Sequence, residues 1–335
     1  MTNVLVTGAT GFLGRHLVRA LVSGGHEVVA LVREDKIDDA FIALGATIEH
    51  GDVLDRASVE RAAEGCEVLF HCAGRVSRDP KDAEALHRLH VEGTKIALDG
   101  ARAKGVKRVV FASTSGVVAV SNDEAPSNEE SPTPTGLIAS WPYYRSKLYA
   151  EMAAFERSGP DFEVVSVNPA LLLGPGDLIG SSTGDVIDII EGKVPFVPGG
   201  GISYVDARDV ACAMLLAWKK GRAGRRYLLH GQNISLKAFA DKVSRIAGVT
   251  PPKAELPRNR VIAGIGADFA KKMQKHLPGL PTIDRAAAEM AQAFWYVDST
   301  RAREELGWSS RDPMETLADT IADLRARGVV WPKVS

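Results

Sequence analysis

Two side chains that can exchange a proton with an alcohol stand four positions apart, Tyr143 and Lys147. In a helix this spacing places both residues on one face. A phenol with a pKa of about 10 is a poor base at neutral pH, but a nearby ammonium favours the phenolate and lowers that pKa. The pair therefore predicts a general acid/base that protonates a carbonyl oxygen or deprotonates an alcohol. Tyr144 is the rival of Tyr143, three positions before the lysine.

Hydroxyl groups that could orient the reacting oxygen follow a predicted strand, Arg108–Ala112. They belong to Ser113, Thr114 and Ser115, and each of the three is a candidate. Ligands of open α/β sheets bind at the carboxyl ends of the strands, where this cluster lies. We therefore expect one of these hydroxyls to polarise the carbonyl group of a substrate.

The first fourteen residues form the element that would bring a redox cofactor to these side chains. Val4–Val6 is an apolar, β-branched run typical of a buried strand, and a helical pattern begins near Phe12. A strand, a glycine-rich turn and a helix together present free backbone N–H groups to a pyrophosphate. The predicted dinucleotide-binding residues of this turn are Gly8, Thr10, Gly11, Phe12, Leu13 and Gly14.

Basic residues near the end of the second predicted strand, Glu27–Val32, indicate which dinucleotide binds. An acidic residue there would hold the ribose 2′-hydroxyl of NAD, but the sequence has Arg33, with Arg15 and Lys36 close by. Guanidinium groups suit the additional 2′-phosphate of NADP. We expect NADP(H) as the preferred cofactor. Asp35 leaves NAD(H) as the alternative. A third interpretation is that these basic residues are solvated surface charges that bind no cofactor.

Residues that follow two further predicted strands complete the expected cofactor site. Asp52 and Val53 come after a short strand, Thr47–Glu49, and could border the adenine. Ala73 and Gly74 come after the next strand, and small residues there allow a cofactor to approach closely.

Strands and helices alternate along the first half of the chain, with continuous apolar strands and short connections. This pattern predicts the α/β class, a doubly wound parallel sheet of the Rossmann type covered by helices on both faces. The predicted helices include Lys81–Lys104 and Tyr143–Arg157, and Ser121–Ser140 reads as a long loop in which Glu129 and Glu130 are solvated.

Beyond Gly174 the alternation gives way to glycine-rich loops and isolated elements. We expect a dinucleotide-binding domain at 1–170, to which 203–230 returns, and a smaller substrate-binding part at 171–202 and 231–330. Predicted helices in this region are Val205–Lys219, Arg260–Lys275, Ile283–Ala293 and Met314–Arg327. Apolar residues offered to a substrate are Leu171–Leu173, Ile179, Val186, Ile189, Val194, Phe196 and Val197.

Composition narrows the range of partners. A net charge of −1 over 335 residues provides no basic field for nucleic acid or an anionic membrane. The apolar runs are too short to span a bilayer, and three cysteines without paired spacing suggest a reducing compartment. We expect a cytoplasmic protein with a small-molecule substrate, no nucleic acid and no transmembrane segment, and a homodimer stays open. No metal is expected, because His71, His87 and His90 lack ligand spacing.

Four groups of residues, taken together, carry a resemblance to a known family: Thr7-Gly8-x-x-Gly11-x-x-Gly14, Ser113-Thr114-Ser115, Tyr143-x-x-x-Lys147 and Asn168-Pro169 followed by Gly174-Pro175. They resemble the extended short-chain dehydrogenase/reductase superfamily, and within it the NAD-dependent epimerase/dehydratase group. The chain is most similar to dihydroflavonol 4-reductases, 3β-hydroxysteroid dehydrogenases and hopanoid-associated epimerase-like proteins. The similarity covers nearly the whole chain.

The resemblance implies roles for individual residues. Thr114 aligns with the catalytic hydroxyl, with Ser113 as the alternative, and Tyr143 is the acid/base. Lys147 also holds the nicotinamide ribose, and Pro169 contacts the nicotinamide. The chain departs from the family at His90, where an asparagine that supports the local backbone usually precedes the Val-x-Gly-Thr motif.

The resulting hypothesis is an NADP(H)-dependent oxidoreductase that interconverts a secondary alcohol and a ketone. Its substrate would be bulky and largely apolar, similar to a sterol, hopanoid or flavonoid, because the C-terminal part offers little to bind a diphosphate. One alternative is a nucleotide-sugar epimerase or dehydratase with retained NAD. Another is a non-catalytic dinucleotide-sensing module.

Overall fold

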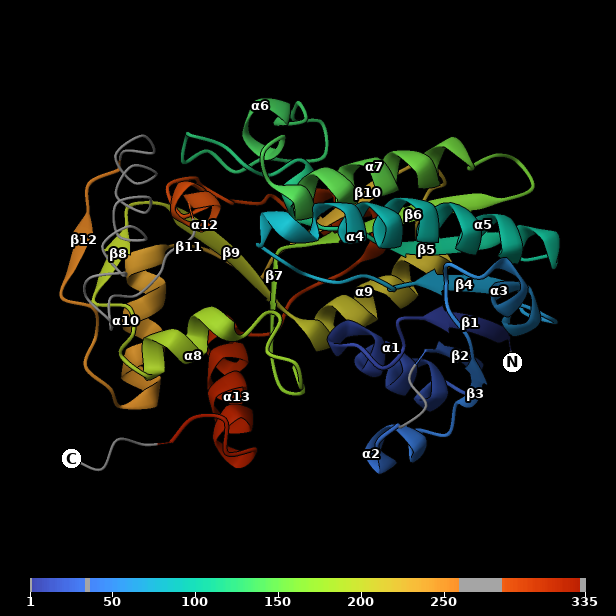
Figure 1. The fold of residues 1–335 in the computed structure, drawn as a ribbon, viewed down its shortest axis with the longest axis horizontal. Helices are drawn as coiled ribbons and strands as arrows, with labels where there is room; N and C mark the ends of the chain where they lie inside the picture. Colours follow the sequence, from blue (N-terminus) through green and yellow to red (C-terminus); the bar gives the residue numbers. More distant parts are fainter. Residues whose placement is uncertain (1, 34–36, 259–284, 332–335) are drawn as a thin grey trace.

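A seven-stranded parallel sheet forms the larger part of the computed structural model, which describes residues 2–33, 37–258 and 285–331 (Figure 1). Its strand order is β10-β6-β5-β4-β1-β2-β3. The strands are β1 (Asn3–Thr7), β2 (Glu27–Val32), β3 (Thr47–His50), β4 (Val68–His71), β5 (Arg108–Ala112), β6 (Glu163–Pro169) and β10 (Arg226–Leu229). The predicted doubly wound sheet is therefore confirmed, and its order reverses between β1 and β4, where such sheets bind their ligands.

Helices cover both faces of this sheet, which explains why its strands are continuous apolar runs. On one face, α1 (Phe12–Ser23) packs against α9 (Ala207–Lys220), and both contribute to one core cluster with the strands. On the other face, α3 (Arg56–Ala62), α5 (Gly93–Ala103) and α7 (Pro142–Glu156) form a second cluster. A short helix, α2 (Asp39–Ile42), follows β2.

The long helix predicted over Lys81–Lys104 is divided into four consecutive segments. It contains a 3-10 turn η1 (Pro80–Asp82), α4 (Ala83–His87), a π-helical segment η2 (Arg88–Glu92) and α5. A π-helical segment inserts an extra residue into the helical repeat and often marks a functional position. Here it places His90 beside the cavity described below.

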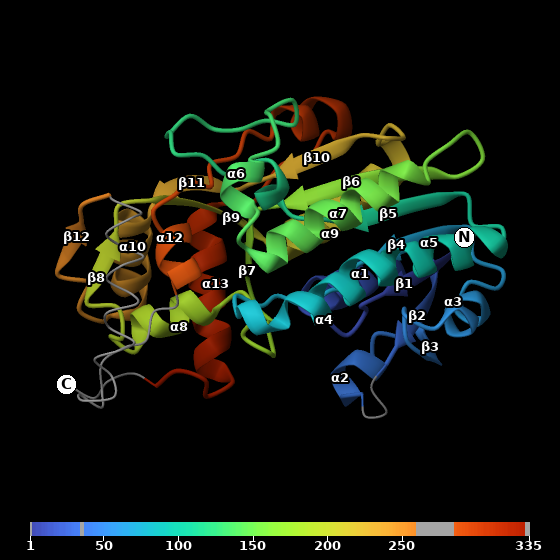
Figure 2. The same ribbon diagram turned by 45° about the horizontal axis from the view of Figure 1, so that its top comes forward.

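A smaller part contains a three-stranded sheet of β7 (Leu171–Leu173), β9 (Gly201–Asp206) and β11 (Gln232–Ser235). A parallel pair, β8 (Phe196–Pro198) and β12 (Ala254–Leu256), lies at its far end (Figure 2). Its core is closed by α8 (Gly184–Ile190), α10 (Leu236–Ala247) and α13 (Pro313–Ala326). The remaining elements are η3 (Ser115–Val117), α6 (Thr135–Ile138), α12 (Arg285–Met290) and η4 (Ala302–Leu306). The domain boundaries at 170, 203 and 230 stay a prediction.

Several local predictions were wrong. Val205 and Asp206 end β9 rather than begin a helix, and the Asp206 side chain caps α9 by accepting from the Arg208 N–H. The segment 121–140 contains α6 instead of only loop. Glu129 is not solvated: its side chain is 3% exposed and accepts a hydrogen bond from the Leu228 N–H at 2.9 Å. The predicted helix Arg260–Lys275 lies outside the described residues.

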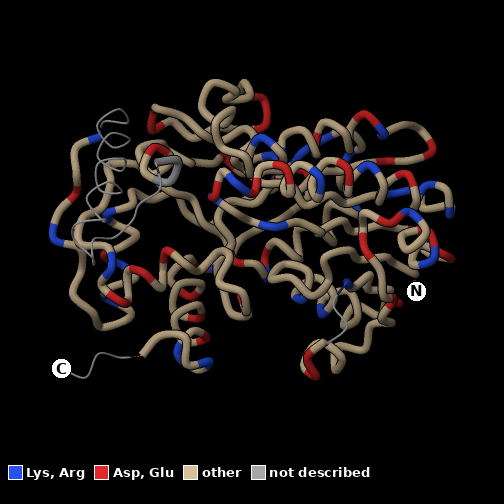
Figure 3. The backbone as a smooth tube through the Cα atoms, in the orientation of Figure 1, with Lys and Arg blue, Asp and Glu red and all other residues tan. Residues whose placement is uncertain are grey.

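Residues of both charge signs are interspersed along the described part of the chain (Figure 3). In the part of the chain that the structure describes, no helix is both long enough and apolar enough to cross a bilayer.

Candidate active site

A cavity of about 400 Å³ lies at the carboxyl ends of the large-sheet strands, between that sheet and the smaller part. It brings together the three predicted catalytic residues, Thr114, Tyr143 and Lys147. Of the residues predicted to bind the cofactor, the cavity is also lined by Leu13, Gly74 and Pro169. The other described residues of this prediction are not among those that line the cavity.

The turn between β1 and α1 has the shape that a dinucleotide phosphate requires. Gly8 has φ +67°, and a Cβ atom there would lie 2.6 Å from the Ala73 nitrogen at the end of β4. A Cβ atom on Gly14 would lie 2.1 Å from the Gly8 carbonyl oxygen. Gly11 begins α1 without a side-chain cap, so the N–H groups of the first turn are available to an anion. These residues, with Thr10 and Phe12 between them, fit a bound pyrophosphate.

Further predicted cofactor residues follow the adjacent strands along the same edge of the sheet. Arg33 comes directly after β2 and is exposed. Asp52 and Val53 come after β3, and the Asp52 carboxylate accepts from the Leu54 N–H at 2.9 Å. Ala73 comes after β4. Lys36 and Asp35 lie outside the described residues, so their predicted roles stay predictions.

Arg15 already has partners of its own. Its guanidinium forms a two-pronged ion pair with the Asp38 carboxylate, one contact being 3.0 Å, and its Nε donates to the Thr10 carbonyl oxygen at 2.8 Å. It also lies over the Phe41 ring, 5.3 Å from the centroid. The guanidinium holds the pKa of Asp38 below its usual range. A cofactor 2′-phosphate would therefore compete with Asp38 for Arg15.

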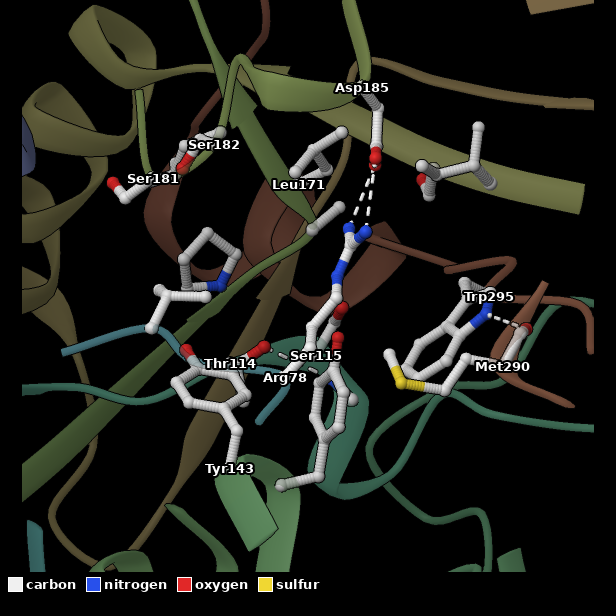
Figure 4. A pocket seen from close by; sticks show the side chains of 18 of the residues that line it. Arg78, Thr114, Ser115, Tyr143, Leu171, Ser181, Ser182, Asp185, Met290 and Trp295 are labelled. Atoms are coloured by element: carbon white, nitrogen blue, oxygen red, sulfur yellow. Dashed lines mark hydrogen bonds and ion pairs between the residues drawn. The ribbon is translucent and has the colours of Figure 1, made fainter. Parts of the chain in front are cut away.

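Tyr143 and Thr114 both line the cavity, and their side chains lie next to each other (Figure 4). Tyr143 lies in the first turn of α7, and Thr114 follows β5 and caps η3. Burial raises the pKa of Tyr143, and a hydrogen bond with the Thr114 side chain lowers it in part. The Ser113 hydroxyl is buried and has no hydrogen-bond partner among the described residues. This contact favours Thr114 over Ser113 as the hydroxyl that acts with the phenol.

Lys147 lies one turn after Tyr143, with its side chain only 6% exposed. Its Nζ donates to the Ala112 carbonyl oxygen at 2.6 Å and lies 4.7 Å from the Phe111 ring centroid. Burial lowers the pKa of Lys147 to about 8, against the opposing field of the Glu151 carboxylate. The prediction that this ammonium makes the phenol more acidic is not met here, because burial controls the pKa of Tyr143.

A buried polar network supports the backbone of Thr114. The Asn168 amide donates to the Thr114 carbonyl oxygen at 3.1 Å and to the Glu151 carboxylate at 2.6 Å. Arg226 forms an ion pair of 2.8 Å with Glu151, which is 1% exposed. Removing one member would leave a buried polar group without its partner, so the network holds Thr114 in place.

His90 occupies the position where the family usually has asparagine. Its Nε2 accepts from the Arg75 N–H at 3.1 Å, so the ring proton lies on Nδ1, which is 2.8 Å from the Ser146 hydroxyl. Ser146 in turn donates to the Tyr143 carbonyl oxygen at 2.8 Å. Burial lowers the pKa of His90 to about 2, so the ring is neutral. Sequence analysis missed this role, although the departure from asparagine pointed to it.

Aromatic side chains form one wall of the cavity. Trp141 and Trp295 are stacked with centroids 5.5 Å apart, and Tyr144 lies 4.8 Å from the Trp295 ring. The predicted apolar residues that also line the cavity are Leu171, Leu172, Ile189, Val194 and Val197. The remaining predicted apolar residues lie elsewhere: Leu173 and Val186 are in the core, and Ile179 and Phe196 are exposed.

One ion pair joins two residues that line the cavity. Arg78, in the loop after β4, donates to both carboxylate oxygens of Asp185 on α8, at 3.0 and 2.8 Å (Figure 4). The carboxylate raises the pKa of Arg78. Neither residue was predicted, since they stand 107 positions apart and share no local motif.

Cys72 also lines the cavity, and burial raises its pKa to about 12, in line with the expected lack of a thiolate. Among the residues that the structure describes, no three His, Cys, Asp or Glu side chains gather to hold a metal ion.

Comparisons with known proteins agree with this geometry. Residues 4–229 match the model of the NAD dependent epimerase/dehydratase family. The chain is 33% identical to a putative dihydroflavonol 4-reductase of Synechocystis sp., over 97% of this chain and 95% of that protein. It is also 33% identical to sterol demethylase protein B of Methylococcus capsulatus, over 97% of this chain and 99% of that protein.

A solved structure has the same fold over the full length. The crystal structure of gox2253 superposes with a TM-score of 0.86 at 29% identity, covering 99% of this chain and all of that one. The chain belongs to the NAD-dependent epimerase/dehydratase family of extended short-chain dehydrogenases/reductases.

Proposed function

We propose that the enzyme interconverts a secondary alcohol and a ketone on a bulky, largely apolar substrate and that it prefers NADP(H). The contact of the Tyr143 and Thr114 hydroxyls inside an aromatic and aliphatic cavity is the observation that carries this proposal. Two hydroxyls in contact provide one proton donor and one hydrogen-bond donor for a single carbonyl oxygen.

In the reducing direction, Tyr143 protonates the carbonyl oxygen and Thr114 donates a hydrogen bond that polarises it. A bound nicotinamide dinucleotide supplies the hydride. Because burial raises the pKa of Tyr143, the phenol carries its proton at neutral pH and is ready to act as the acid. Lys147, one turn along the helix, orients the backbone of β5 through Ala112 and would also hold the nicotinamide ribose.

The cavity wall supports a flat, apolar substrate. The Trp295 indole, stacked on the buried Trp141, lines the cavity together with aliphatic residues such as Leu171 and Ile189. Aromatic faces contribute large apolar contact areas with a preferred orientation. Two relatives are named for fused-ring molecules: a sterol demethylase protein and a putative dihydroflavonol 4-reductase.

The preference for NADP(H) rests on the basic residues near the end of β2. Arg33 lies directly after that strand, at the place where an acidic residue would hold the ribose 2′-hydroxyl of NAD. Arg15 would join it only by exchanging the Asp38 carboxylate for a phosphate. The affinities of the enzyme for NADPH and NADH should therefore be compared directly.

A substrate panel tests the proposed reaction. The purified enzyme is given NADPH with androstenone, a flavanone and UDP-glucose, and nicotinamide absorbance and products are followed. We expect net NADPH oxidation with a fused-ring ketone. Conversion of UDP-glucose without net change in absorbance, together with copurified NAD, would establish the epimerase alternative. Cofactor binding without turnover of any ketone, alcohol or sugar nucleotide would favour the sensing module.

A further inference from the structure

The ion pair between Arg78 and Asp185 joins the two parts of the molecule across the substrate cavity. Arg78 belongs to the loop after β4 of the large sheet, whereas Asp185 lies in the first turn of α8 in the smaller part. Both side chains line the cavity and remain 51% and 39% exposed. The pair is therefore in reach of a molecule bound in the cavity and is not sealed in the protein core.

The pair is neutral as a whole, but it still has hydrogen-bonding capacity. Arg78 uses two of its nitrogens on Asp185, and a guanidinium carries five N–H donors. The remaining donors can bind a carbonyl or hydroxyl oxygen, and the carboxylate can accept from a hydroxyl. A ligand that carries a neutral polar group can thus bind to the pair without breaking it.

An anionic ligand faces a different balance of charge. Its carboxylate or phosphate would compete with Asp185 for the same guanidinium and would approach a second cavity carboxylate, Asp188. Asp188 is 3.6 Å from the Lys193 ammonium, which is itself 2.5 Å from Glu191. Like charges brought together at a binding site oppose association and are a common means of excluding wrong partners.

We propose that the Arg78–Asp185 pair selects substrates by charge, accepting a neutral hydroxyl or carbonyl group and excluding a carboxylate or phosphate. This inference rests on the proposed function and adds the polar feature that its apolar substrate should carry. Asp185 is the residue that keeps the arginine from acting as an anion site. Arg78 and Asp185 are thus specificity-determining residues for the reaction.

Two ketosteroid probes that differ by one anionic substituent test the proposal: androstenone and the same ketosteroid with a carboxylate on its ring D. The kcat/KM of each is measured with NADPH for the wild type, Asp185→Asn and Arg78→Met. Binding of each probe is measured separately by quenching of intrinsic tryptophan fluorescence, because Trp141 and Trp295 form the cavity wall. Asp188→Asn is the matched control, since it removes a cavity carboxylate without releasing the guanidinium.

The wild type should prefer the neutral probe. Asp185→Asn should raise the ratio of carboxylated to neutral kcat/KM by about tenfold or more, because an unpaired guanidinium attracts the probe carboxylate. Arg78→Met should lower the same ratio, because Asp185 then lacks its counter-charge. Asp188→Asn should move the ratio by less than about threefold, as expected for a charge outside the pair.

Two results would overturn the inference. In one, Asp185→Asn and Arg78→Met change both probes equally, which would make the pair a mechanical link between the two parts. In the other, Asp185→Asn and Asp188→Asn shift the ratio by the same amount. Absence of ketone binding and reduction in every variant, including the wild type, would instead refute the proposed function, so the two failures are distinguishable.

Discussion

The Lys147 ammonium donates a 2.6 Å hydrogen bond to the carbonyl oxygen of Ala112, the last residue of β5. This bond ties α7, which carries Tyr143, to the end of the strand that precedes Thr114. Burial disfavours the charged form of this side chain and lowers the pKa of Lys147 to about 8, against an ordinary value of 10.5. The difference corresponds to roughly 3–4 kcal/mol at about 1.4 kcal/mol per unit.

The stability of the fold should therefore depend on pH through Lys147. Between pH 8 and 10.5 the unfolded chain binds a proton that the folded chain does not, so stability should rise with pH in this window. Lys147→Met lacks the titrating group. The Tm of the wild type minus that of the variant should therefore increase as the pH is raised from 7 to 10. A Tm difference that stays constant over this range would contradict the assigned pKa.

His90 should act as a positioning residue for Tyr143. His90→Ala would leave the Arg75 N–H and the Ser146 hydroxyl without their partner, at a cost of about 1–3 kcal/mol. We expect kcat to fall about tenfold, since the loss acts on the orientation of the acid, with little change in KM. His90→Asn should restore most of kcat, because an amide can accept from one group and donate to the other.

The matched control for His90 is His87→Ala, a change of an exposed histidine in the same helical region. It should leave kcat within about twofold of the wild type. Equal effects of the two alanine variants, or failure of asparagine to restore kcat, would show that His90 does not orient the acid.

Gly8 should be required for cofactor binding. In Gly8→Ala the new Cβ atom would lie 2.6 Å from a backbone nitrogen, so the turn must open and the affinity for NADPH should fall at least about tenfold. Gly25→Ala is the control, because Gly25 has a similar φ of +77° and nothing within 4 Å of the added atom. Titrations that follow NADPH fluorescence measure the NADPH affinity of both variants. Equal affinities of Gly8→Ala and Gly25→Ala would show that the pyrophosphate binds elsewhere.

The cofactor preference should depend on Arg33 and on Asp38. Arg33→Ala should weaken NADPH binding by about tenfold and leave NADH binding within about twofold, because only NADPH carries the 2′-phosphate. Asp38→Asn should strengthen NADPH binding, because it releases the Arg15 guanidinium. The test is to measure the dissociation constants of NADPH and NADH for each variant. Arg19→Ala, which changes an exposed residue on α1, is the control. A loss of NADH affinity equal to that of NADPH would refute the 2′-phosphate assignment.

Local sequence patterns were sufficient to predict the cofactor turn and the large sheet apart from its edge strand, β10. Buried parallel strands such as Val4–Val6 are continuous apolar runs, and glycine spacing reports a turn in which side chains have no room. The Tyr143–Lys147 pair was equally visible because its spacing is set within one helix. The start of α9 was misplaced because Val205 continues an apolar run into a strand end that Asp206 then caps.

Relationships between distant parts of the chain could not be predicted. The Arg78–Asp185 pair, the stacking of Trp141 on Trp295 and the burial of Glu129 all depend on tertiary packing. The pKa of Tyr143 likewise depends on burial as well as on neighbouring charge, and spacing along a helix reports neither.

The role of Tyr143 as the acid/base is the central claim, and its adjacent tyrosine offers a matched comparison. The decisive measurement is the single-turnover rate of NADPH oxidation by Tyr143→Phe and Tyr144→Phe with the fused-ring ketone that the wild type reduces, alongside the NADPH dissociation constant. We predict that Tyr143→Phe loses about a thousandfold or more in rate with unchanged NADPH affinity, and that Tyr144→Phe loses far less. A rate for Tyr143→Phe within about tenfold of the wild type would contradict the account.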